Sequence, residues 1–152
     1  MSFWISLLGR ILLGGLVVVG LIVSGITSAG ADVRIRSSLG GAVEDYLRFF
    51  SRVRQTGERV IIDGPCFSAC TLVLSTIPKN RICVTSRAVL GFHAARWVDP
   101  RTGRMSPAPE ATRIVTRSYP AGVRAWIKKR GGLTPRVIYL RGRELGSLYR
   151  RC

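Results

Sequence analysis

The sequence predicts a single α/β domain with a small, mainly parallel sheet, preceded by an N-terminal hydrophobic segment. Short apolar runs alternate with segments in which apolar residues recur at helical spacing, which is typical of βαβ units. The chain has 152 residues, of which 47% are hydrophobic, enough for one domain with a core. Its 17 Gly and 7 Pro follow no fixed period, which excludes collagen-like and low-complexity chains, and no internal repeat occurs at solenoid spacing.

The first 31 residues have the features of an export signal. Arg10 is followed by an uncharged stretch, which is most apolar at 11–23 and ends in Ala-Gly-Ala at 29–31. An uncleaved membrane anchor is the alternative, because the uncharged stretch is just long enough to span a bilayer. We therefore expect a signal peptide or anchor over 1–31. The domain over 32–152 would then be periplasmic, or held at the inner membrane facing the periplasm.

The first half of the domain reads as strand, helix and strand. Apolar and charged residues alternate over 33–36, which predicts a short strand. Apolar residues fall on one helical face over 42–54, and Gly57 ends that helix. A buried strand is expected at 59–62, and the Asp-Gly-Pro at 63–65 stops it.

The second half continues the alternation. Small apolar residues predict a buried helix, and two further apolar runs predict two strands. A polar stretch with three Pro predicts a loop. The helix expected after that loop is broken at Pro120. In chain order, these elements are the helix 68–74, the strands 82–85 and 88–92, the loop 99–109, the helix 110–130, an apolar run at 137–140 and a last helical turn at 144–149.

Four cysteines fit an exported location. Cys66, Cys70, Cys83 and Cys152 form an even set of disulfide candidates, and disulfides persist in a periplasm-like compartment. Four cysteines allow three full pairings, among which the sequence does not choose. A zinc site is disfavoured because Cys66 and Cys70 lack a second closely spaced pair, and no haem attachment motif is present. We expect neither a metal nor an organic cofactor.

The chain is strongly basic. Lys and Arg total 24 against 8 acidic residues, for a net charge of +16. This charge attracts polyanions and anionic membrane surfaces. The basic residues are not interleaved with aromatic or groove-reading elements, so we expect no nucleic-acid partner. A basic envelope protein that binds anionic surfaces is one reading of this charge.

Ser68 and His93 are the candidate reactive residues. Ser68 lies where a strand turns into a helix, and His93 ends a second strand 25 residues later. Gly40 and Gly41 follow the first strand, where a backbone can approach a ligand closely. Because the carboxyl ends of parallel strands share one edge of a sheet, these elements should meet at one crevice.

Three segments resemble, in order, motifs of the Clp protease proteolytic subunit and the wider ClpP/crotonase superfamily. The first is DVRIRSSLGGAV at 32–43, similar to that family's strand and Gly-Gly turn. The second is GPCFSACTLVL at 64–74, similar to its nucleophile segment, and the third is RICVTSRAVLGFH at 81–93, similar to the strands leading to its catalytic histidine. The C-x-S-A-C form looks closer still to small exported bacterial members. The resemblance covers about residues 32–96.

The resemblance implies a serine hydrolase, a peptidase or an esterase, on a ClpP/crotonase-like fold. Ser68 would be the nucleophile and His93 the general base. Backbone N–H groups of Gly40 or Gly41 and of Ala69 would form the oxyanion hole. The partner implied is a peptide or ester substrate.

The chain departs from the family pattern in ways that bear on activity. The family's third catalytic residue, an Asp, falls on Val137 here, and a histidine without its carboxylate loses its fixed tautomer. Asp99, Glu110 and Glu144 are the substitute candidates, or the centre is a dyad. Glu144 is ranked above Asp99, and the absence of any carboxylate partner is ranked above both. The family's first strand and helix are missing, so a second copy of the chain could complete the sheet. A catalytically inactive binding or assembly module is therefore the alternative function.

Overall fold

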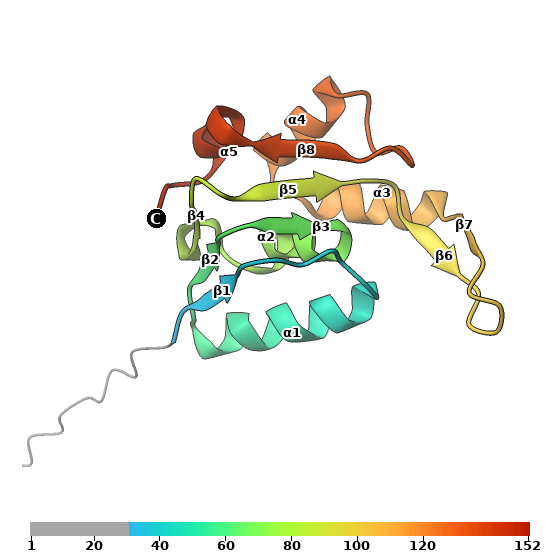
Figure 1. Cartoon of the computed structure of the whole chain (residues 1–152), viewed down its shortest axis with the longest axis horizontal. Coiled ribbons are helices and arrows are strands. Elements are labelled where there is room, and N and C mark those ends of the chain that lie inside the picture. Colours follow the sequence, from blue (N-terminus) through green and yellow to red (C-terminus); the bar gives the residue numbers. More distant parts are fainter. Residues whose placement is uncertain (1–30) are drawn as a thin grey trace, which may run out of the picture.

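The computed structural model describes residues 31–152 and has a mixed α/β architecture (Figure 1). Residues 1–30, which hold nearly all of the predicted export segment, lie outside the described part of the chain. Among the described residues, no helix has the length and apolar character needed to cross a membrane.

The first sheet is parallel and has the strand order β1-β2-β4. It consists of β1 (Val33–Ile35), β2 (Val60–Ile62) and β4 (Ile82–Val84), and α1 (Val43–Thr56) forms the crossover from β1 to β2. Every residue of β2 and β4 is buried, as expected for apolar strands in a parallel sheet. The predicted βαβ arrangement is confirmed for β1, α1 and β2.

The second sheet is mixed and has the order β3-β5-β8. Here β3 (Pro65–Phe67) runs parallel to β5 (Val89–Phe92), and β8 (Ile138–Arg141) runs antiparallel to β5. The strand predicted at 59–62 ends before Asp63, as expected, but a second strand that was not predicted begins at Pro65. Proline is tolerated there as the first residue of a strand, where its missing N–H breaks no ladder.

Helices cover the sheets and connect their strands (Figure 1). The segment predicted as one helix from residue 68 begins as a tight 3-10 turn and then becomes α-helical. Pro120 separates two helices, as predicted, and precedes the first residue of the second. The elements are η1 (Ser68–Leu72), α2 (Val73–Thr76), η2 (Lys79–Arg81), α3 (Pro109–Ser118), α4 (Ala121–Lys129) and α5 (Gly142–Leu148).

The stretch predicted as the loop 99–109 contributes to a projecting hairpin instead (Figure 1). Its strands are β6 (Arg96–Val98) and β7 (Met105–Pro107), which pair antiparallel. Every residue of both strands is exposed, so the hairpin has no buried face and no apolar pattern that would reveal it in the sequence.

The core joins both sheets to the helices behind them. Phe92 of β5 packs edge-on against Tyr119, with ring centroids 5.3 Å apart, and lies 5.7 Å from the Trp126 ring. Phe92 and Leu90 are buried among the side chains of this cluster. This packing anchors β5, the strand that carries His93 at its end.

Two disulfides close the described domain. Cys66 pairs with Cys70, and Cys83 pairs with Cys152. The first bridge spans the turn that contains Ser68, and the second holds the C-terminal tail against β4. Both are compatible with an exported protein in an oxidising compartment.

Candidate active site at the carboxyl ends of β3 and β5

Ser68 occupies a strained turn between β3 and η1. Its φ is 54°, and no other non-glycine residue in the described range has a positive φ. The left-handed conformation costs an L-residue about 1–2 kcal/mol, so the surroundings must hold it. A serine presented on a sharp strand-to-helix turn is the arrangement that exposes a nucleophilic hydroxyl.

Buried hydrogen bonds fix the carbonyl side of this turn. The Thr71 hydroxyl donates to the Ser68 carbonyl oxygen at 2.6 Å, and the Tyr119 hydroxyl lies 2.6 Å from Thr71 Oγ1. Because the Thr71 hydroxyl donates its proton to the Ser68 carbonyl oxygen, the Tyr119 hydroxyl is the donor in its hydrogen bond with Thr71 Oγ1. Burial raises the pKa of Tyr119 to about 12, which keeps this donor protonated. The chain of bonds ties the turn to the aromatic core.

Gly40 lies directly against the Ser68 turn. A Cβ atom at Gly40 would fall 2.5 Å from Ser68 Cβ, 2.8 Å from the Phe67 oxygen and 3.2 Å from the Ala69 nitrogen. With a φ of 93° as well, the position accepts only glycine. The structure therefore brings Gly40, Ser68 and Ala69 together. Gly41 is the next residue and faces Tyr46, whose ring a Cβ at Gly41 would meet at 3.5 Å.

Backbone pairing holds the Gly40 segment in place. The Ser38 N–H donates to the Pro65 oxygen at 2.8 Å, and the Phe67 N–H donates to the Ser38 oxygen at 2.9 Å. The chain between β1 and α1 thus runs alongside β3. This explains why β3 exists despite its short length, since it is paired on both sides.

His93 leaves the neighbouring strand at the same edge as Ser68. β3 and β5 are parallel, and Phe67 pairs with Gly91. Ser68 and His93, which follow these two strands, therefore lie at the same edge of the sheet. His93 is half-buried. Among the described contacts, no hydrogen bond joins the Ser68 hydroxyl to the His93 ring.

The His93 ring has a backbone partner where a catalytic triad has a carboxylate. Nδ1 lies 2.7 Å from the Ala94 carbonyl oxygen. Because a carbonyl only accepts, the neutral ring carries its proton on Nδ1 and leaves the Nε2 lone pair free. This is the tautomer that a general base needs.

The structure does not bring Glu144 to His93. Glu144 lies on α5, and both its carboxylate oxygens accept from Arg130 Nη2 at 2.7 Å. β8 runs antiparallel to β5 and pairs Arg141 with Val89, which places the start of α5 at the opposite end of β5 from His93. The hydrogen bond from Arg130 lowers the pKa of Glu144, so this carboxylate is held as an ion in a surface pair.

Asp99 is also committed elsewhere. Its carboxylate accepts from the backbone N–H groups of Arg101 and Thr102 in the hairpin turn, at 2.8 and 3.0 Å. Those bonds lower the pKa of Asp99. Val137 precedes Ile138, the partner of Phe92, and therefore reaches the His93 end of β5 with an apolar side chain.

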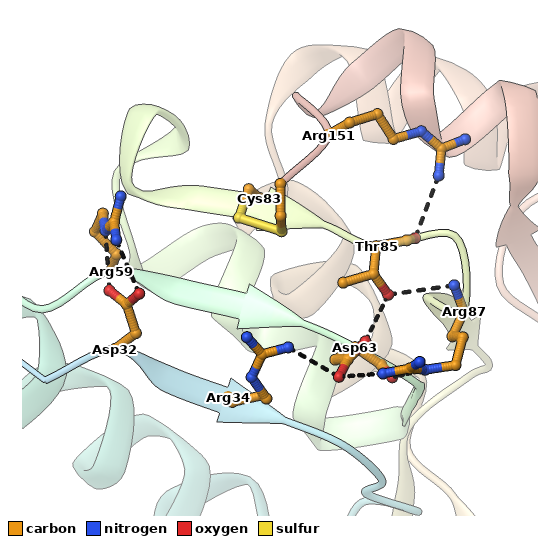
Figure 2. Close-up of a disulfide and its surroundings, with 9 residues drawn as sticks. Asp32, Arg34, Arg59, Asp63, Cys83, Thr85, Arg87 and Arg151 are labelled. Carbon is orange, nitrogen blue, oxygen red and sulfur yellow. Dashed lines mark hydrogen bonds and ion pairs between the residues drawn. A yellow bond between two sulfur atoms is a disulfide. The ribbon is translucent and has the colours of Figure 1, made fainter.

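The sequence reasoning missed a second polar cluster, built around Asp63. This aspartate is only 5% exposed. Its Oδ1 accepts from the Thr85 hydroxyl at 2.7 Å, and its Oδ2 accepts from Arg34 at 2.9 Å and from Arg87 at 2.6 Å (Figure 2). The Thr85 hydrogen bond first, and then the two arginines, lower the pKa of Asp63 to about 2. The sequence positions of Asp63 and Thr85 could have indicated this cluster, because each residue directly follows a strand of the parallel sheet.

No three His, Cys, Asp or Glu side chains gather as metal ligands within residues 31–152. Comparison with protein-family models and with curated proteins finds no match to this chain. The function must therefore be inferred from the geometry of the residues described above.

Proposed function

We propose that this chain is an exported serine hydrolase of the ClpP/crotonase-like type, acting on peptide or ester substrates. The observation that carries the proposal is the left-handed Ser68, wedged against Gly40 at the end of β3 while His93 follows the adjacent parallel strand. A strained serine beside a glycine backbone, with a histidine after the neighbouring strand, combines the elements of acyl transfer.

In the proposed reaction, His93 Nε2 takes the proton of the Ser68 hydroxyl as Oγ attacks the substrate carbonyl carbon. Backbone N–H groups of Gly40 or Gly41 and of Ala69 stabilise the resulting oxyanion. His93 then returns the proton to the leaving amine or alcohol as the acyl-enzyme forms. Water, deprotonated by the same ring, attacks the acyl carbonyl and releases the acid and Ser68.

Because Ala94 supplies a carbonyl where a triad has a carboxylate, the rate of hydrolysis in this scheme is limited. The carbonyl orients the His93 ring and selects its tautomer, but it is neutral and stabilises the imidazolium less than a carboxylate does. Replacing the carboxylate of a triad lowers kcat by about 10⁴, so slow turnover is expected of this dyad.

A catalytically inactive binding or assembly module is the second candidate. It is favoured by the absence of a carboxylate on His93 and of a Ser68–His93 hydrogen bond among the described residues. In either case we propose export to the periplasm, with residues 1–31 cleaved or retained as an inner-membrane anchor.

Labelling of the purified protein with a fluorophosphonate probe tests the proposal. We expect the adduct on Ser68, its loss in Ser68→Ala and its strong reduction in His93→Gln. Ser106→Ala is the matched control, since Ser106 is exposed on β7. Ester and peptide hydrolysis are then compared in the same proteins. Equal rates in wild type and Ser68→Ala, with no label on Ser68, would favour the binding module.

A further inference from the structure

A positively charged hollow lies at the carboxyl edge of the parallel sheet, apart from Ser68. Its volume is about 490 Å³, within the range of small-ligand pockets. Three arginines and one carboxylate line it, together with a Gly-Pro backbone. The lining residues are Arg34, Arg36, Asp63, Gly64, Pro65 and Arg87, and we call this hollow the arginine pocket.

The position of the arginine pocket follows from the sheet. Arg36 directly follows β1, Asp63 follows β2 and Thr85 follows β4, and these three strands are parallel neighbours. In open α/β sheets, ligands bind in the crevice outside the carboxyl ends of the strands. The pocket therefore occupies the place where such a sheet offers a binding site.

The pocket has more positive charge than its buried carboxylate requires. Asp63 is satisfied by Thr85, Arg34 and Arg87 (Figure 2). Arg36 takes no part in that network, and within residues 31–152 its guanidinium forms no hydrogen bond or ion pair. Three arginines against one carboxylate leave a net charge of +2 in the pocket.

Asp63 also fixes two of the guanidinium groups in position before a ligand binds. Arg34 uses Nη1 and Arg87 uses Nη2 to reach the carboxylate, while their side chains remain 43% and 72% exposed. Arg87 also donates from Nε to the Asp63 backbone oxygen at 3.4 Å. The remaining N–H groups of the two forks are left for solvent or a ligand. Groups fixed before binding lose less entropy when a ligand arrives, which favours affinity.

We propose that the arginine pocket binds a phosphate-bearing anion. A phosphomonoester carries nearly two negative charges at neutral pH, which matches the net charge of the pocket. Its oxygens also fit the planar, paired N–H geometry of guanidinium groups. The phosphate could belong to a small soluble molecule or to a lipid headgroup, since both present the same chemistry to Arg36.

Calorimetric titration of the full-length chain with glycerol 3-phosphate tests the proposal. Loss of a charge-assisted hydrogen bond should raise the Kd of Arg36→Gln by about tenfold. Arg101→Gln removes the same charge from the exposed hairpin turn and should leave the Kd unchanged. Because Arg36 has no partner in the fold, its variant should keep the circular dichroism spectrum of wild type.

A second measurement distinguishes the source of the phosphate. Binding to phosphatidic acid vesicles that exceeds binding to phosphatidylcholine vesicles, and that Arg36→Gln weakens but Arg101→Gln does not, would support the proposal with a lipid headgroup as ligand. Binding of glycerol 3-phosphate alone would support it with a soluble ligand. Equal losses in the two variants, or no binding of either probe by wild type, would overturn it.

Discussion

Reduction of the Cys83–Cys152 disulfide should destabilise the domain about twice as much as reduction of Cys66–Cys70. The long bridge joins residues 69 positions apart, and the short bridge joins residues 4 positions apart. The long bridge also secures the tail beside β4, where the Val84 N–H donates to the Arg150 oxygen at 3.0 Å.

The magnitudes follow from the chain entropy that each bridge removes from the unfolded state. In the loop-closure relation, this entropy grows with the logarithm of the number of residues enclosed. For the long bridge the relation yields about 4 kcal/mol at 25 °C, and for the short bridge about 2 kcal/mol. The difference of about 2 kcal/mol is large enough to measure against a typical domain stability of about 5–15 kcal/mol.

The assay keeps one bridge at a time and compares each protein with itself. In the Cys66→Ala, Cys70→Ala double variant, only the long bridge remains, and the Cys83→Ala, Cys152→Ala double variant retains only the short one. Each is unfolded in guanidinium chloride with and without reductant, so sulfur atoms lost from the core cancel within each pair. Equal losses on reduction, or a larger loss for the short bridge, would refute the loop-entropy reasoning.

The other predictions concern the two polar sites. Gly40→Ala should cost at least about 2 kcal/mol and Gly103→Ala about 1 kcal/mol in urea unfolding, because both have a positive φ but only Gly40 is crowded; equal losses would contradict this. Ser68→Gly should be more stable than Ser68→Ala by about 1 kcal/mol in thermal unfolding, because glycine relieves the left-handed strain, and identical melting temperatures would argue against strain. Since the folded pKa of Asp63 lies at about 2, below its ordinary 3.8, its contribution is complete above the ordinary value and is lost as pH falls toward 2. In a Tm–pH profile, Asp63→Asn should flatten this decline and Thr85→Val should move it to higher pH; an unchanged profile in both would exclude the network as its origin.

Part of the fold and of the candidate site could be predicted from local pattern. The amphipathic period predicted α1, and the apolar runs predicted β2, β4 and β5, because burial on one face or on both leaves a direct trace in the residue order. The order of Gly40, Ser68 and His93 along successive strands predicted that they would meet at one sheet edge. The structure places Gly40 against Ser68 and brings His93 to the end of the neighbouring strand.

Other features depend on partners distant in the chain. β3 has three residues and begins with Pro65, so no period marks it, and it exists because Ser38 and β5 pair with it. Glu144 has a suitable side chain for a catalytic carboxylate, but the antiparallel direction of β8 carries it away from His93.

By itself, the sequence determined an α/β domain with four cysteines, a strong positive charge and a serine and a histidine at strand ends, because composition and periodicity are local properties. Only the tertiary structure decided which cysteines pair, that Ser68 takes a left-handed backbone, and that Asp63 gathers Arg34 and Arg87. Each of these depends on distances between residues far apart in the chain, or on packing that overrides a local preference. Strand register and direction set those distances, and neither is written in any short stretch of residues.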